Sequence, residues 1–341
     1  MLMKATSRVV LVAASLFVPS AVLGQTKPVP PAVNVLIGNA TTIDTQAEIN
    51  DKFAELLTRY SDGRLKAAAR HGESLGGNVQ MLAALQAGSV HGMVLPSGFM
   101  STAVPDLALF DLPFLLPGAP GGITAFAAQS QAAARMKELA EQRGVHVIGF
   151  HGIGAQSLLS RFPVNKLADI QGKKFRIIPS PPRVGAYQDW GAVPRPMELS
   201  EVYTALQQGN LDGMENPPQI LFRMKFHEVA RYLTITEHST FVSATIVSKK
   251  WFDGLPKDLQ EAVTRAGKDT ISWADVAYTK SQNEGLEALR KTISVTTLPP
   301  AELQKMKDLA RTGVWERMKS DPQRGAMVKL LEEDIARFSK K

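Results

Sequence analysis

Short apolar runs and stretches with apolar residues on one helical face alternate along the chain. Ile49, Phe53 and Leu57 lie on one face of a predicted helix, which Asp62-Gly63 ends. The elements predicted around it are strands at 33–37, 65–69 and 92–95 and a second helix at 79–86. Asn78 is the expected N-cap of the second helix and Gly88 its stop.

A similar order of elements returns in the middle of the chain. The predicted elements are strands at 174–178 and 194–197, a helix at 183–190 ended by Gly191, and a helix from Ser200 as N-cap to Gln208. Alternating helices and strands favour an α/β fold with mainly parallel sheets.

An internal repeat indicates how these elements are grouped. Residues 84–93 and 205–214 share six identities in ten positions, and each copy joins the end of a helix, a glycine and the start of a strand. The repeat predicts two similar α/β lobes, although such joints can also look alike by chance.

Residues 257–291 then form one long helical pattern without proline. At about 1.5 Å per residue it extends roughly 50 Å, enough to cross both lobes. Two more helices are expected near Ala301 and Pro322.

The N-terminus has the layout of a targeting segment. Lys4 and Arg8 are followed by an apolar run from Val9 to Val18, and Val22-Leu23-Gly24 suits cleavage before Gln25. The run is shorter than the roughly 20 residues that span a bilayer. A signal peptide at 1–24 is therefore predicted, with a short membrane anchor as the alternative, and the mature chain is expected to be exported, soluble and not membrane-spanning.

Composition excludes several kinds of chemistry. The chain has 341 residues, more than one hydrophobic core usually serves, so two domains are expected. It has no cysteine, which excludes thiol nucleophiles, zinc–thiolate sites and disulfides. The formal charge of +7 is mild, and an aromatic content of 7% does not favour nucleic-acid binding.

His227-Glu228 opens like a zinc-protease motif, but Arg231 stands where the second histidine is needed. Gly149, Gly152 and Gly154 lack dinucleotide-binding spacing and are interpreted as a flexible crossing between lobes.

Two polar residues at strand ends are the candidates for ligand binding. Arg176 lies in the strand at 174–178 between Phe175 and Ile177, and its planar fork suits a carboxylate. Asn216 follows the repeat strand and can donate or accept. A surface arginine and a turn-forming asparagine before proline are the alternatives.

These residues lie in motifs that resemble the solute-binding proteins of TRAP (tripartite ATP-independent periplasmic) transporters. The resembling segments are 172–177, 196–207, 212–217, 225–229, 236–238, 75–78 and 110–114, and the similarity extends over nearly the whole mature chain. The resemblance implies a two-lobe venus-flytrap fold that closes around one ligand, with a long helix spanning both lobes. The lobes are then expected at 25–152 plus 242–281 and at 153–241 plus 282–341.

The resemblance also implies a function and a set of site residues. The function is capture of a small organic acid in the periplasm, by a monomer without cofactor, metal or catalysis, and its delivery to the membrane permease. Arg176 matches the carboxylate clamp and Asn216 a pocket asparagine. The other matches are Leu199 against the ligand, Asn39 at the end of the first strand, and His238 near the ligand.

One departure bears on the ligand. Many family members carry a second cleft arginine where this chain has Gln156, which brings no charge. A pocket with Gln156 is predicted to prefer one carboxylate over two, unless Arg183 or Arg195 restores the charge. The alternative functions are an organic-acid-binding protein of an ABC importer or a sensor, and a secreted hydrolase or lyase.

Overall fold

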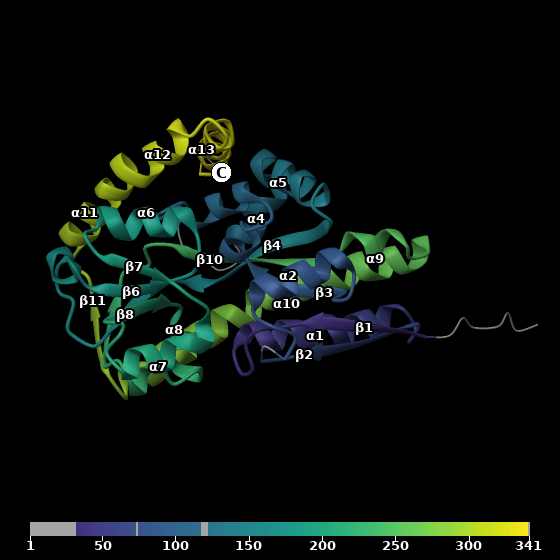
Figure 1. Cartoon of the computed structure of the whole chain (residues 1–341), viewed down its shortest axis with the longest axis horizontal. Coiled ribbons are helices and arrows are strands. Elements are labelled where there is room, and N and C mark those ends of the chain that lie inside the picture. The colour runs from purple at the N-terminus through teal and green to yellow at the C-terminus, as the bar shows by residue number, and fades with distance from the viewer. Residues whose placement is uncertain (1–31, 73, 117–121, 340–341) are drawn as a thin grey trace, which may run out of the picture. The chain divides into compact units, whose positions relative to one another are not determined.

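The computed structural model describes residues 32–72, 74–116 and 122–339, which form two sheets covered by helices (Figure 1). The predicted signal peptide lies outside the described residues. Within them, no helix is both long and apolar enough to cross a membrane. The α/β architecture predicted from the alternating pattern is confirmed.

The first sheet has five strands in the order β2-β1-β3-β10-β4. Their bounds are β1 Val33–Gly38, β2 Leu65–Arg70, β3 Gly92–Pro96, β4 Val145–Ala155 and β10 Thr240–Ser248. Strands β1, β2 and β3 are parallel, and β10 is antiparallel to both β3 and β4. The helices that pack on this sheet include α1 (Thr45–Tyr60), α2 (Asn78–Ala87), α4 (Gly122–Gln129) and α5 (Gln131–Glu141).

The second sheet has six strands in the order β11-β9-β5-β8-β6-β7. Their bounds are β5 Ser157–Ser160, β6 Lys174–Ile177, β7 Val193–Pro196, β8 Gly213–Asn216, β9 Tyr232–Ile235 and β11 Ser294–Thr297. Its helices include α6 (Pro181–Asp189), α7 (Val202–Gln207) and α8 (Pro218–Arg223). Strands β6, β7 and β8 are parallel to one another, whereas β5 is antiparallel to its neighbours β8 and β9.

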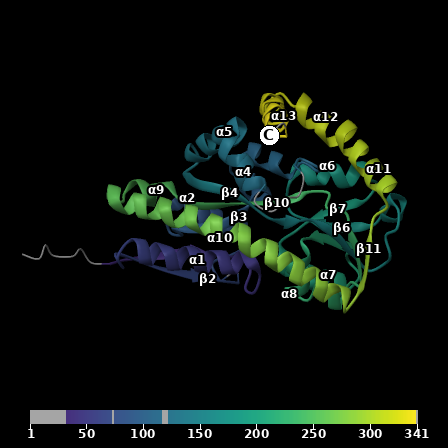
Figure 2. The ribbon, with the colours of Figure 1, turned by 180° about the vertical axis from the view of Figure 1, so that it is seen from behind.

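The two sheets are connected at three places. Strand β4 is followed after the single residue Gln156 by β5, and residues 236–239 lead from β9 back to β10. Helix α10 (Lys257–Arg290, 34 residues) runs past both sheets (Figure 2). Its small residues allow close packing: a Cβ on Gly285 would lie 2.4 Å from the backbone of Gln219 on α8. The predicted long helix is thus present and contacts elements of both sheets.

The internal repeat has the same local structure in its two copies. Gly88 and Gly209 both have positive φ, at 90° and 78°, in the left-handed region that favours glycine. Ser89 N donates to Ala84 O and Asn210 N to Ala205 O, both at 2.9 Å. Each copy ends a helix and leads into a parallel strand, β3 in one sheet and β8 in the other.

The C-terminal helices contact both groups of elements. They are α11 (Pro300–Ala310), α12 (Glu316–Ser320) and α13 (Gly325–Phe338), with a π-helical turn at 311–315. Asp334 on α13 accepts hydrogen bonds from Ser130 Oγ (2.7 Å) and Ala132 N (2.8 Å) at the start of α5. The C-terminal helix therefore packs beside the first sheet, and the lobe boundaries derived from the sequence stay a prediction.

Three local expectations are wrong. Gly77, not Asn78, is the N-cap of α2, and it makes no side-chain capping bond. Residues 199–201 form a 3₁₀ turn before α7, so Ser200 does not cap that helix. Gly149, Gly152 and Gly154 lie inside strand β4, paired with or beside β10, rather than in a flexible joint.

Candidate functional site

A cavity of about 200 Å³ lies at the carboxyl ends of parallel strands from both sheets. The lining that follows β1, β2 and β3 includes Thr41, Asp44, Gln46, Asn78 and Phe99. The lining from the second sheet and its helices includes Arg176, Ile178, Glu198, Leu199, Asn216 and Ile220. The topology therefore brings residues far apart in the sequence to one cavity.

Arg176 lies on β6 and its guanidinium reaches the cavity. The side chain is 2% exposed, and its Nε and Nη2 donate to the carbonyl of Met197 at 3.1 and 2.9 Å. Among the described residues, no carboxylate forms an ion pair with it. Burial lowers the pKa of Arg176 to about 10, against the opposing effect of the Glu215 and Glu198 carboxylates, so it keeps its charge at neutral pH.

Asn216 and Leu199 line the same cavity. Asn216 is the last residue of β8 and is 2% exposed, and its Nδ2 has no hydrogen-bond partner within the described structure. A buried donor without a partner costs free energy, so an acceptor from a ligand is expected there. Leu199 begins the 3₁₀ turn after β7 and is half-buried.

Three other sequence-predicted residues, Asn39, Gln156 and His238, are buried but do not line the cavity. Asn39 Nδ2 donates to the Thr41 carbonyl at 2.6 Å, and its Oδ1 accepts from Gln46 Nε2 at 3.2 Å. Asn39 thus positions two lining residues. Gln156 and His238 lie on the two strand crossings, where they join a buried charge network.

Arg183 on α6 is the centre of that network. Its Nη1 donates to Glu215 Oε1 at 2.6 Å and its Nη2 to Asp111 Oδ1 at 2.9 Å. In the amide orientation that satisfies both partners, Gln156 Oε1 accepts from the same guanidinium at 2.5 and 2.9 Å. His238 Nε2 bonds Glu215 Oε2 at 2.8 Å. These side chains are almost fully buried, so the network is a permanent part of the fold.

The charges of the network stabilise one another. Burial would raise the pKa of Glu215, but the Arg183 guanidinium and the hydrogen bond from His238 outweigh burial and bring it to about 2. Burial would lower the pKa of Arg183, but Asp111 and Glu215 hold it above its ordinary value. Arg183 is therefore neutralised by two carboxylates of the protein. Arg195, opposite Arg176 on β7, is exposed and does not line the cavity.

Two polar contacts join elements of one sheet to those of the other, and the first of them links two residues that line the cavity. Asn78 Nδ2 on α2 donates to Glu198 Oε2 at 2.9 Å. Arg223 on α8 forms an ion pair with Glu48 on α1 at 2.6 Å. The lining residues and these contacts therefore come from elements of both sheets.

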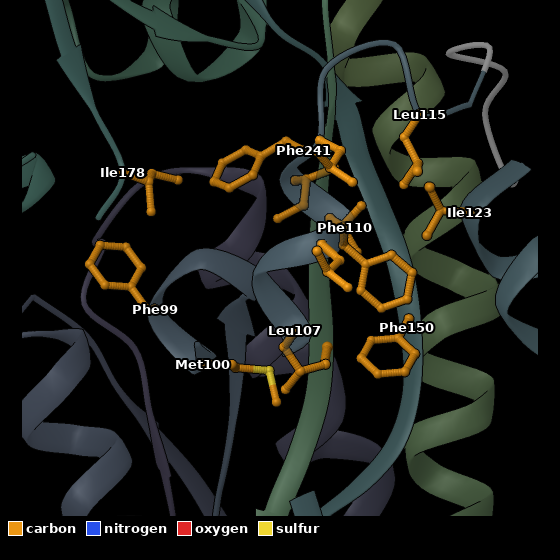
Figure 3. Packing of buried hydrophobic residues seen from close by; sticks show 14 of the residues in the cluster. Phe99, Met100, Leu107, Phe110, Leu115, Ile123, Phe150, Ile178 and Phe241 are labelled. Atoms are coloured by element: carbon orange, nitrogen blue, oxygen red, sulfur yellow. The ribbon is translucent and has the colours of Figure 1, made fainter. Parts of the chain in front are cut away.

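The remaining wall is apolar. Phe99, Ile178 and Phe241 line the cavity and belong to the large core cluster, at whose edge Figure 3 shows their side chains together. Phe99 comes from the first sheet's side and Ile178 from the second. The cavity therefore combines the Arg176 guanidinium with an apolar stretch of wall.

Sequence reasoning missed several lining residues. Asp44, Asn78, Glu198 and Phe241 all line the cavity. Glu198 lies within the motif at 196–207, so its position beside Leu199 was the available signal. Among the described residues, no group of three or more histidine or acidic side chains could hold a metal ion.

Two sheets joined by crossing strands, with a pocket at the carboxyl ends of both, are typical of a two-lobe solute-binding protein. The chain belongs to the family of bacterial extracellular solute-binding proteins, family 7, whose sequence profile matches residues 38–321. This family contains the TRAP transporter binding proteins that the motifs resemble, so that resemblance is confirmed.

Individual relatives agree with this assignment. The C4-dicarboxylate-binding periplasmic protein of Rhodobacter capsulatus is 31% identical over 70% of this chain and 72% of its own length. The 2,3-diketo-L-gulonate-binding periplasmic protein of Escherichia coli is 26% identical over 85% of this chain and 88% of its own. A TRAP binding protein of Desulfovibrio salexigens with bound orotic acid superposes with a TM-score of 0.84 at 26% identity, covering 89% of this chain and 99% of its own.

Proposed function

We propose that this chain captures a small organic acid in the periplasm, after removal of the signal peptide at 1–24, and delivers it unchanged to the permease of a TRAP transporter. The observation that carries the proposal is Arg176, a buried guanidinium at the cavity without a carboxylate partner among the described residues. The ligands named for the three relatives are all carboxylic acids or their anions.

Arg176 is the main anchor in this proposal and Asn216 the second. The Arg176 guanidinium would grip the ligand carboxylate, and Asn216 Nδ2 would donate to it or to a neighbouring oxygen. Leu199 packs against the ligand, while Asn39, Gln156 and His238 act through the residues that they position. The absence of charge on Gln156 then favours a single carboxylate.

The state of Arg183 supports the choice of one carboxylate. A closed cavity excludes water, so each ligand charge needs a partner inside the protein. Arg183 could be that second partner only by releasing Asp111 or Glu215, which would leave a buried carboxylate unpaired. Arg195 is exposed and outside the lining.

Mass spectrometry of what co-purifies in the cavity, followed by thermal-shift screening of organic acids, tests this function. A ligand at a hundred times its dissociation constant should stabilise the protein by about 2.7 kcal/mol. Small-angle scattering should give a smaller radius of gyration with the ligand than without it. If a saturating ligand leaves the radius unchanged, the flytrap mechanism is wrong, and chemical turnover of the ligand would show an enzyme instead.

A further inference from the structure

The pocket carries a carboxylate as well as a guanidinium. Glu198 directly follows Met197, whose carbonyl holds Arg176, and its side chain lines the same cavity. It is half-buried, and Asn78 from the opposite side donates to its Oε2 at 2.9 Å. Closure thus places a negative charge in the wall of the space that the ligand occupies.

A second carboxylate lines the pocket from the other side. Asp44 is 1% exposed, and its Oδ1 accepts from Thr41 Oγ1 at 2.6 Å and from Ala47 N at 2.9 Å. These bonds make Asp44 the cap of helix α1. Asp44 is therefore structural, but its charge still contributes to the field in the cavity.

The balance of charge around the cavity is not that of a site for multiply charged anions. Among the described residues, Arg176 and Arg183 are the buried arginines, and the charge of Arg223 also acts on Asp44. The nearby acidic groups, on the lining or in the network behind it, are Asp44, Asp111, Glu198 and Glu215. Each further negative charge brought into this low-dielectric space raises the electrostatic cost. A positive charge on the ligand offsets that cost.

The apolar wall also suits a cation. Phe99 and Phe241 bring aromatic rings to the cavity, close to Ile178 (Figure 3). The face of an aromatic ring attracts an ammonium group, most strongly where water is excluded. Carboxylate, aromatic rings and a guanidinium together provide contacts for both ends of a dipolar ligand.

We propose that the ligand is a zwitterion, with its carboxylate at Arg176 and a primary or quaternary ammonium group facing Glu198. This proposal rests on the proposed function, because it assumes that the cavity binds an organic acid. Glu198 is then the residue that determines specificity, and Arg176 the anchor shared with other acids.

Matched ligands test the proposal by calorimetry on the mature protein freed of co-purified ligand. For chains of three to six carbons, each ω-amino acid is compared with the plain acid, the ω-hydroxy acid and the diacid of equal length. Glycine betaine and proline betaine represent quaternary ammonium ligands. The best zwitterion should bind about tenfold or more tightly than its plain acid and its diacid, as expected for a partly desolvated charge pair.

Glu198→Gln separates charge from shape. The amide oxygen can still accept from Asn78, so closure is retained while the charge is lost. The variant should bind the zwitterion and the plain acid with affinities within about threefold of each other. Glu201→Gln is the matched control, because Glu201 is exposed in the same turn and outside the lining. It should keep the wild-type preference.

The remaining outcomes are distinguishable. Equal wild-type affinity for a zwitterion and its plain acid, or tightest binding of a diacid, would overturn the zwitterion proposal and leave organic-acid capture intact. A preference for zwitterions that persists in Glu198→Gln would also overturn the role of Glu198. If the wild-type protein binds none of these acids and none co-purifies with it, the proposed function fails together with this inference.

Discussion

Arg176 and Arg183 are both almost completely buried, on adjoining elements of the second sheet, but their surroundings are opposite. Arg183 is held by Asp111 and Glu215 and lies outside the cavity lining. Arg176 bonds only a backbone carbonyl among the described groups and lines the cavity. The comparison indicates that burial alone does not identify a binding residue. In the proposed function, what distinguishes the ligand anchor is a buried charge that forms no ion pair with a carboxylate of the described residues.

The largest expected effect is a loss of folding stability when Arg183 is replaced. Arg183→Met leaves Asp111 and Glu215 buried without their cation, which should lower the free energy of unfolding by about 3–5 kcal/mol. Urea unfolding of the ligand-free protein measures this loss. If the variant does not fold, Arg183→Lys provides a milder version that keeps the charge. If urea unfolding shows that Arg183→Met lowers the free energy of unfolding by less than about 1 kcal/mol, the structural role of Arg183 is contradicted.

Arg176→Ala should weaken ligand binding strongly and change the free energy of unfolding little, which is the reverse of what Arg183→Met does. Removing the anchor leaves the ligand carboxylate buried and unpaired, so affinity should fall by about 2–5 kcal/mol, or roughly 30- to several-thousand-fold. Arg176→Lys should also bind poorly, because a point charge does not reproduce the planar fork. Unfolding in urea should change far less than for Arg183→Met. Wild-type affinity by calorimetry, in a folded Arg176→Ala protein, would rule out the anchor.

Acid should destabilise the Arg183 network through Glu215. The folded-state pKa of Glu215 is about 2, below its ordinary value of 4.5. Its contribution to stability is therefore complete above pH 4.5 and is lost as the pH falls towards 2. Between pH 6 and pH 3 the wild-type protein should lose about 2 kcal/mol more than Glu215→Gln. Parallel urea titrations at pH 6 and pH 3 measure the difference, and equal losses in both proteins would contradict it.

Arg195 sharpens the comparison as a third arginine without either role. It is exposed on β7 opposite Arg176 and outside the cavity lining. Arg195→Ala should leave affinity within about twofold and stability within about 0.5 kcal/mol. A clear loss of affinity for a diacid in this variant would show instead that Arg195 reaches the ligand and supplies the second charge.

The elements and Arg176 could be predicted because their signals are local. Apolar periodicity locates the strands and the long helix, and the repeat at 84–93 and 205–214 identifies two equivalent helix–glycine–strand joints. Arg176 lies between two apolar strand neighbours, a pattern that also fits a surface arginine, and the family resemblance is what indicated the cleft. These features depend on neighbours within a few residues, which a single sequence displays.

The charge network and half of the pocket could not be predicted because they depend on distant contacts. Arg183 meets Asp111 and Glu215 only after the two sheets are brought together. Asn78 has the chemistry of a helix cap, but its amide bonds Glu198 across the cavity instead. The roles of Asn39, Gln156 and His238 at the ligand stay predictions, since the structure places them behind the lining.

The bridges between Asn78 and Glu198 and between Glu48 and Arg223 also bear on how fast a solute can exchange. Under the proposed function, a solute held between walls from both sheets leaves when these bridges separate. Its dissociation rate constant therefore has an upper limit set by the opening rate, whatever the strength of its own contacts. Hinge motions of this kind take microseconds to milliseconds. Any partner that separates the two rims shortens the residence time of the solute without touching it.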